Sequence, residues 1–196
     1  MGNSWVISDT HFNHTNIIKY SNRPFDSVDQ MNLAMIDAWN EVVEDGDTVY
    51  HLGDFGFEAN KPEHMPLEYI GGSLNGTKIL IRGNHDSERR GDGLKAKNAE
   101  FWDETHDYLE VKFGKTRFIM FHYPIESWHG AHRDRLHLHG HLHSKNHKGS
   151  KWYKPHRYDV GVDDTTPFGR PYSLERLRDK LNAQEDYVAA SHHSEN

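Results

Sequence analysis

Short runs in which apolar and polar residues alternate recur along the chain and predict its strands. Residues 4–9 place Trp5, Ile7 and Asp9 on one face, which is typical of a strand that ends in a carboxylate. The glycine at Gly114-Lys115 suits a tight turn that joins two alternating strands into a hairpin. The two strands of the hairpin are predicted at 108–113 and 116–121. The other strands are predicted at 48–53, 78–82, 135–139 and 158–163.

Apolar residues at helical spacing predict the helices. The strongest helix begins at Ser27, which forms a capping box with Gln30, and it ends near Gly46. Its apolar stripe consists of Val28, Met31, Met35, Trp39 and Val42. Strands and helices alternate early and an antiparallel section follows, so the pattern predicts a mixed α/β fold with helices outside the sheets. Shorter helices are predicted at Ile17-Ile18, from Pro66, and from Leu174 to Leu181.

Composition limits the class of protein. The chain has 196 residues and a hydrophobic fraction of 35%, so we expect one domain over 1–184 and a polar tail over 185–196. No apolar run approaches the ~20 residues of a membrane span, and the N-terminus lacks the pattern of a signal peptide. The absence of cysteine excludes disulfides, thiolate metal sites and cysteine nucleophiles. We therefore expect a cytoplasmic protein without a membrane partner.

The net charge of -7 is unevenly distributed. Between Arg133 and Arg157 there are seven Lys or Arg and one acid, Asp134, which gives this segment +6 and the rest of the chain -13. The segment also contains Trp152-Tyr153, and aromatic rings among cations can stack a base while the cations hold phosphate. Segment 133–157 is thus either a solvated loop or the element that holds the non-reacting part of a nucleotide or nucleic-acid substrate.

Five polar blocks each follow a predicted strand. They are Asp9-Thr10-His11, Gly53-Asp54, Gly83-Asn84-His85-Asp86, His122 and Gly140-His141-Leu142-His143. Because sites in such folds gather at the carboxyl ends of strands, the five blocks can share one cleft. The candidate metal ligands among them are Asp9, His11, Asp54, Asn84, His122, His141 and His143. Seven ligands exceed what one tetrahedral ion takes and suit two ions that share a carboxylate; nitrogen and oxygen ligands without sulfur favour Mn²⁺, Fe or Zn²⁺.

In this order the five blocks resemble the calcineurin-like metallophosphoesterase superfamily, over about residues 4–163 and without a departure at any ligand position. The resemblance implies a mixed β-sandwich of two sheets flanked by helices. It implies Asp9, His11 and His143 on one metal, Asn84, His122 and His141 on the other, and Asp54 between them. It also implies phosphoester hydrolysis by a metal-bridging hydroxide that attacks phosphorus. Mn is the first choice of metal, with Fe, Zn or Ni as alternatives.

Three further residues are candidates for the chemistry. The resemblance makes His85 the group that stabilises or protonates the departing oxygen, with Asp86 as the carboxylate that orients it. A simple hydrogen-bonding role beside the ligand Asn84 is the alternative for His85. Arg23, beside a rigid proline, either forks onto a substrate phosphate or forms an ordinary ion pair, and Asn84 is a second candidate for substrate contact.

The leading hypothesis is therefore a dimetal phosphodiesterase, because His85 can assist an alkoxide leaving group. A phosphomonoesterase on the same site is the alternative.

Two readings from other classes of protein fit the sequence less well. A catalytically silent interaction scaffold is expected to have lost ligands, whereas all seven are present. A metallo-β-lactamase-type site, suggested by His139, His141 and His143, needs Asp-His after a His-x-His pair, where this chain has Ser144-Lys145. His139 and the nearby His137 are expected behind the ligands or in solvent. The sequence leaves the substrate and the oligomeric state open.

Overall fold

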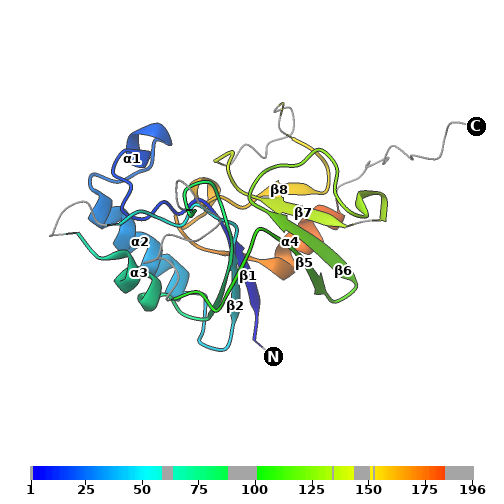
Figure 1. Ribbon diagram of the computed structural model, residues 1–196, viewed down its shortest axis with the longest axis horizontal. Helices are drawn as coiled ribbons and strands as arrows, with labels where there is room; N and C mark the ends of the chain where they lie inside the picture. The colour runs from blue at the N-terminus through cyan, green and yellow to red at the C-terminus, as the bar shows by residue number, and fades with distance from the viewer. Residues whose placement is uncertain are drawn as a thin grey trace, which may run out of the picture.

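The structure is a computed structural model that describes residues 2–58, 64–87, 101–133, 135–143, 151 and 153–183. Two sheets form its centre (Figure 1). The first has the order β4-β3-β2-β1-β9, with β1 Ser4–Ile7, β2 Thr48–His51, β3 Thr77–Ile81, β4 Glu104–His106 and β9 Tyr172–Ser173. The second has the order β5-β6-β7-β8, with β5 Tyr108–Phe113, β6 Thr116–Phe121, β7 Leu136–His139 and β8 Arg157–Asp159. The predicted mixed α/β fold with two sheets flanked by helices is confirmed.

Strand alternation places apolar side chains on both faces of the first sheet. Val6 of β1 packs between the sheets, in a cluster with Phe118 of β6 and Leu138 of β7. Its neighbour Ile7 faces the other way and packs against the helices with Trp39. Both faces are therefore covered, as expected for a sheet whose strands β1 to β4 run parallel.

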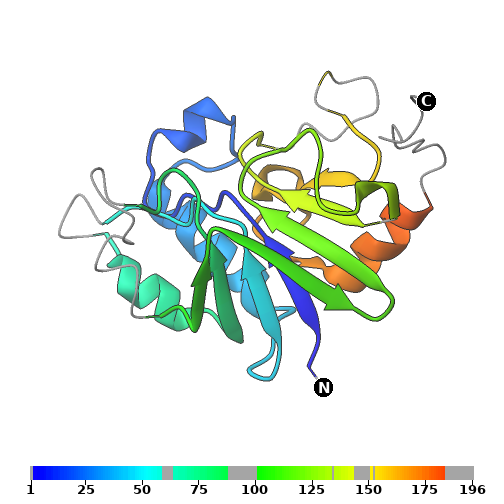
Figure 2. The same ribbon diagram turned by 45° about the vertical axis from the view of Figure 1, so that its right-hand side comes forward.

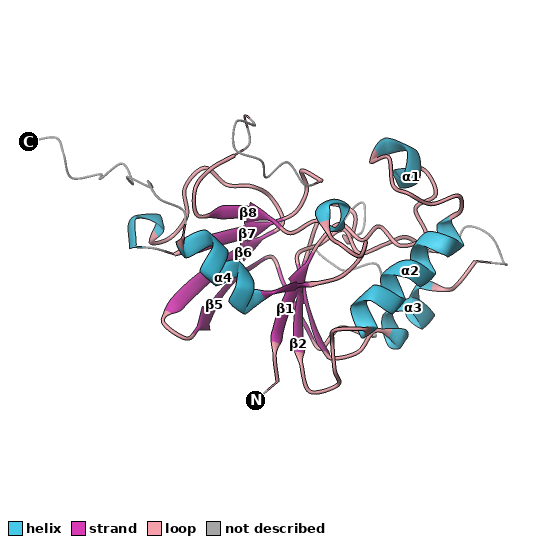
Figure 3. Cartoon of the chain, turned by 180° about the vertical axis from the view of Figure 1, so that it is seen from behind, coloured by secondary structure: helices cyan, strands magenta, loops and turns pink. Residues whose placement is uncertain are grey.

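The helices lie on the outside, as Figure 3 shows. They are α1 Ile17–Tyr20, α2 Val28–Asn40, α3 Leu67–Ser73 and α4 Leu174–Asn182, with the 3₁₀ helices η2 Ala131–Arg133 and η3 Val162–Asp164. α2 and α3 pack side by side on the outer face of the first sheet, and α4 closes the space between the sheets with Leu174, Leu177 and Leu181. None of the helices in the described ranges is long and apolar enough to cross a membrane.

The hairpin and the closing helix are as predicted, but two boundaries are wrong and two strands were missed. α2 ends at Asn40, before Gly46, because the carboxylate of Asp47 accepts hydrogen bonds from Glu44 N and Trp5 Nε1 and holds the chain in turns. The last predicted strand stops at Asp159, whose Oδ1 accepts from Gly161 N at 2.8 Å and bends the chain into η3. The short strands β4 and β9 were not predicted. The predicted tail 185–196 lies outside the described residues.

The strands position the site by their common direction. β1, β2 and β3 of the first sheet are parallel, and so are β6 and β7 of the second. Their carboxyl ends converge on one side of the molecule, where the loops that follow them meet between the sheets (Figure 2). A parallel bridge between Ser8 and Gly161 and a hydrogen bond from Gly140 N to His122 O fasten these loops together.

Candidate metal centre

Most predicted ligands stand in an unusual backbone conformation just beyond a strand. Five of the seven have a positive φ: Asp9 56°, His11 50°, Asp54 58°, His141 70° and His143 48°. This left-handed region costs an ordinary residue roughly 1–2 kcal/mol, and such strain collects at functional sites. The surrounding loops therefore stabilise conformations that the ligand residues would not adopt by themselves.

The first group of ligand atoms comes from Asp9, His11 and His143, and these atoms lie within 4.8 Å of one another. The Asp9 carboxylate is held in place by His141 N, which donates to its two oxygens at 3.1 and 3.0 Å. His143 Nδ1 lies 2.8 Å from Asp163 Oδ2. Because an ionised carboxylate only accepts, Nδ1 carries the proton and Nε2 keeps a free lone pair.

The second group comes from Asp54, His122 and His141, again within 4.8 Å. His122 Nδ1 donates to Leu52 O at 2.7 Å, so its Nε2 also keeps a lone pair. That Nε2 lies 3.1 Å from Asn84 Oδ1 and 3.5 Å from Asp54 Oδ2. The same Asp54 oxygen lies 3.7 Å from His11 Nε2 in the first group, so one carboxylate reaches both.

The electrostatics of these residues fit bound cations. His11 is 2% exposed, and both of its ring nitrogens are buried without a hydrogen-bond partner. Burial, with the nearby charges of Asp159 and Asp54, raises the pKa of Asp9 well above its usual value. Carboxylate, amide and imidazole atoms that carry lone pairs are thus buried close together and repel one another, at spacings close to those of ligands that share an ion at ~2.1 Å. Divalent cations would relieve this repulsion.

Two glycines make room for the carboxylates. A Cβ on Gly140 would collide with Ser8 Oγ and Asp9 Oδ2, and a Cβ on Gly83 would collide with Asp54 Oδ1. The Gly-Asn-His-Asp and Gly-His-x-His blocks therefore need glycine for steric reasons, because the backbone passes directly beside the carboxylate of a candidate ligand.

The adjacent residues His85 and Asp86 lie in different surroundings: His85 lines the cleft and Asp86 is buried. His85 N donates to Asp54 Oδ1 at 2.8 Å, and the His85 ring lies 5.4 Å from that of His11, so the imidazole lines the cleft beside both groups. The Asp86 carboxylate is buried and accepts from the backbone N–H groups of Asp54, Phe55 and Gly83 at 2.7 to 2.9 Å. Asp86 thus fixes the loop that carries Asp54, a role that replaces the predicted one of orienting the His85 ring.

Arg23 also differs from its prediction. Its side chain is 0% exposed; it donates to Asp163 Oδ1 at 2.8 Å and to the carbonyls of Asp9 and Thr10 at 2.7 and 2.8 Å. A guanidinium enclosed in this way has no open face for a substrate phosphate. The structure therefore corrects the predicted substrate contact, and Arg23 instead braces the loop of the first ligand group.

An open cleft of about 710 Å³ lies over the two groups. Besides predicted residues it is lined by His14, Tyr20, Ser21 and Asp163, which the sequence did not single out. Asp163 orients a ligand although it is 20 residues away in sequence, and no local pattern reveals such a contact. Burial lowers the pKa of His14.

The structure describes His137 and His139 and only part of the basic segment 133–157. His137 and His139 are buried behind the ligands and bonded to backbone carbonyls, of Ile119 at 3.0 Å and Gly140 at 2.8 Å. Residues 144–150 and 152 of the basic segment lie outside the described residues. Of its described part, Arg135 stands at the start of β7, away from the ligands at the other end of that strand.

Comparison with known proteins places the chain in a family. Residues 3–154 match the calcineurin-like phosphoesterase superfamily domain. An uncharacterized protein of Methanocaldococcus jannaschii is 35% identical over 88% of both chains, and the gene 66 protein of Mycobacterium phage L5 is 28% identical over 93% of this chain and 95% of that protein. A protein of unknown function from Aquifex aeolicus has a solved structure with a TM-score of 0.69 and 29% identity, covering 92% of this chain and 100% of that one. The chain therefore belongs to the calcineurin-like phosphoesterase superfamily.

Proposed function

We propose that the protein hydrolyses phosphodiesters with the help of two divalent metal ions. The observation that carries the proposal is the position of Asp54 Oδ2, 3.7 Å from His11 Nε2 and 3.5 Å from His122 Nε2, between two ligand groups. Asp9, His11 and His143 would hold one ion and Asn84, His122 and His141 the other, with Asp54 shared. Two ions at such a site polarise a phosphoryl group and lower the pKa of water from about 15.7 toward 7.

The chain supplies charge and orientation. Asp9 and Asp54 contribute two negative charges, so a centre that holds two divalent ions keeps a net charge near +2 and attracts phosphate despite the acidic chain. Leu52 O and Asp163 fix the imidazoles of His122 and His143 with Nε2 toward the ligand groups. These contacts prepare the site before substrate arrives.

The proposal assigns proton transfer to the leaving oxygen to His85. Its backbone N–H is bonded to Asp54 Oδ1, which fixes the residue at the edge of the cleft, next to the ligand Asn84. A protonated imidazole there donates its ring proton to the departing alkoxide oxygen. This step matters most for poor leaving groups, because a good leaving group departs without a proton.

The lining of the cleft favours diesters over monoesters. Among the described residues that line it there is no Lys or Arg, whereas Ile17, Tyr20 and Leu142 offer apolar surface. A monoester dianion would gain from an additional cation, while a diester carries a single charge and a second organic group that needs a surface to contact. Phosphomonoesters are the alternative substrates of the same site.

A metal and substrate panel tests the proposal. Purified protein is assayed with Mn²⁺, Ni²⁺, Fe²⁺ and Zn²⁺ on bis(p-nitrophenyl) phosphate and on p-nitrophenyl phosphate. We expect hydrolysis of the diester, supported best by Mn²⁺. Faster hydrolysis of the monoester would reverse the substrate preference, and inactivity with all four metals would contradict an enzymatic role and favour a scaffold.

The His85→Ala variant tests the proton donor. It is expected to keep its metal and to lose about 10²–10⁴-fold in turnover on alkyl phosphodiesters, with a smaller loss on nitrophenyl esters. His106→Ala, which removes a half-buried imidazole of β4, is the matched control and should change neither rate. Equal losses on both leaving groups would contradict the assignment of His85 as an acid.

A further inference from the structure

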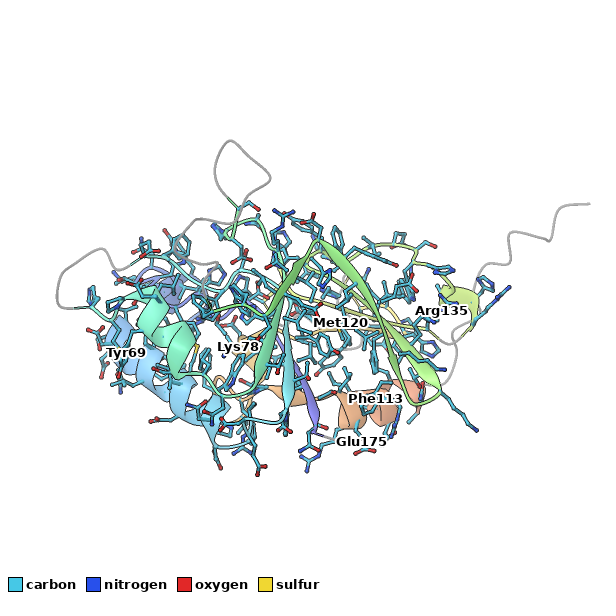
Figure 4. The ribbon with its side chains drawn as sticks, turned by 60° about the horizontal axis from the view of Figure 1, so that its bottom comes forward. Tyr69, Lys78, Phe113, Met120, Arg135 and Glu175 are labelled. Carbon is cyan, nitrogen blue, oxygen red and sulfur yellow. The ribbon has the colours of Figure 1, made fainter. Side chains whose placement is uncertain are left out.

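A second pocket lies far from the metal ligands, at the other end of the second sheet. Its volume is about 700 Å³, and it is formed by the turn of the β5–β6 hairpin, by η2 and the start of β7, and by the end of α4. β6 begins at Thr116 in this pocket and ends just before His122, so the strand separates the two places by about 20 Å, at ~3.3 Å per residue. Figure 4 shows Arg135, one of its lining residues, at the end of the molecule opposite Tyr69 of α3.

The pocket is strongly cationic, although the chain as a whole carries a net charge of -7. Its lining includes Lys112, Lys115, Arg117, Arg133 and Arg135, and none of the described residues that line it is an acid. Three of these cations, Lys112, Lys115 and Arg133, have no carboxylate within salt-bridge range in the described part of the chain. Asp134 lies outside the described residues.

One carboxylate stands nearby and is shared. Glu110 Oε2 lies 3.4 Å from Arg117 Nη1 and 3.4 Å from Arg135 Nη1, while Glu110 Oε1 lies 2.8 Å from His129 Nδ1. The hydroxyl of Tyr108 also donates to Glu110 Oε1, at 3.0 Å. This single, shared carboxylate aligns the two guanidiniums but leaves most of the positive charge of the pocket uncompensated.

The strand register adds a second, independent observation. Lys112 of β5 and Arg117 of β6 are directly opposite one another in the antiparallel hairpin. Like charges at opposed positions destabilise a strand pair. Lys112 is exposed and Arg117 half-buried, so neither cation is needed to fill the core. The pair of Arg117 with Glu110 offsets only part of this repulsion, and an anion between the two cationic side chains would offset the rest.

We propose that this pocket binds a compact anion with two or more linked phosphate groups. The cations come from separate elements and converge on a hollow, which suits a compact ligand better than an extended strand that follows a charged stripe. Arg117 and Arg135 offer planar forks for phosphate oxygens, and Lys112 and Lys115 offer point charges. Thr116 and Asn182 add neutral hydrogen-bonding groups. The inference does not depend on the hydrolytic activity proposed for the metal centre.

Isothermal titration calorimetry with tripolyphosphate tests the pocket on the full chain. The Lys115→Ala/Arg133→Ala variant removes two exposed cations and is expected to weaken binding by roughly tenfold or more. Lys19→Ala/Arg176→Ala makes the same charge change at exposed positions outside the pocket and outside segment 133–157, and it should stay within about twofold of wild type. Binding should also fall steeply with added salt.

Further arms identify the occupant. Asp54→Asn, which disables the metal centre, should leave tripolyphosphate binding intact; its loss there would assign the anion to the metal centre and overturn the proposal. Equal binding by wild type and Lys115→Ala/Arg133→Ala would overturn it too. Tighter binding of a single-stranded oligonucleotide than of tripolyphosphate would also overturn the proposal. The same holds if the full chain does not bind tripolyphosphate and binding is seen only after deletion of residues 184–196, which include the acids Glu185, Asp186 and Glu195.

Discussion

His143 Nδ1 lies 2.8 Å from Asp163 Oδ2, and the other oxygen of that carboxylate receives Arg23 Nε at 2.8 Å. Burial by itself would raise the pKa of Asp163, but the hydrogen bond from His143 and the charge of Arg23 outweigh it, and the pKa is lowered. The carboxylate is therefore ionised and keeps His143 Nε2 directed toward Asp9 and His11. The Arg23–Asp163 ion pair thus connects His143 of the first ligand group to the backbone carbonyls of Asp9 and Thr10, to which Arg23 also donates.

Asp163→Asn should weaken metal binding in the first group by about 10–100-fold, because the amide no longer fixes the tautomer of His143. Competition with a chromogenic chelator measures the affinity, and thermal unfolding checks that the variant folds. Asp164→Asn, at the exposed neighbouring position, is the matched control. Unchanged affinity in Asp163→Asn would mean that the hydrogen bond does not tune the ligand.

Gly140→Ala should lower both stability and metal content, because its Cβ meets Ser8 Oγ and Asp9 Oδ2. Such overpacking costs about 1–3 kcal/mol. Gly72→Ala, in exposed helical surroundings with no atom near the added Cβ, should instead be neutral or slightly stabilising. Urea unfolding and metal analysis of the two variants make the comparison. Full metal content in Gly140→Ala would show that the loop can shift without disturbing Asp9.

Arg23→Ala should destabilise the fold by about 3–5 kcal/mol, since it leaves the buried Asp163 carboxylate without its partner. Arg82→Ala removes the guanidinium of a more exposed pair with Asp107 and should cost about 0–1 kcal/mol. Denaturant midpoints measure both. A raised KM for the diester together with unchanged stability in Arg23→Ala would instead restore the substrate contact predicted from the sequence.

Stability should fall between pH 6.5 and 4 because of His137. Burial lowers the pKa of this imidazole to about 4, so the unfolded chain binds the proton that the folded chain rejects. The stabilisation is therefore complete above about pH 6.5 and is lost as the pH falls, at up to ~1.4 kcal/mol per pH unit. Urea unfolding at several pH values, with a chelator present, measures the slope, and His137→Gln should reduce it by up to that amount. Other buried imidazoles, such as His51, whose pKa burial lowers to about 3, contribute the rest. An unchanged slope in this variant would contradict the assignment.

Most strands and the positions of the candidate ligands were predictable because each polar block directly follows an apolar run. A strand that ends in Gly-Asp or Gly-Asn places its polar side chain at the sheet edge whatever the rest of the chain does. The family resemblance then grouped the ligands, and the structure brings Asp9, His11 and His143 together in one place and Asp54, His122 and His141 in the other.

The positioning contacts were not predictable, because they depend on packing between distant segments. Arg23, beside a rigid proline, was predicted either to contact a substrate phosphate or to form an ordinary ion pair. The fold encloses it in an ion pair with Asp163, 140 residues away. Asp86 was paired with the adjacent His85, but it bonds to the amides of Asp54, Phe55 and Gly83. β9 has two residues, too few for a period to be seen in the sequence.

Metal analysis of wild type and Asp54→Asn tests the central claim most directly. If one carboxylate serves both ligand groups, wild-type protein should hold about two transition-metal ions per chain. Asp54→Asn should then lose both ions and all activity together, while Asp37→Asn, at an exposed position of α2, keeps them. Wild-type protein with one ion or none, or an Asp54→Asn variant that still binds two, would contradict the shared centre.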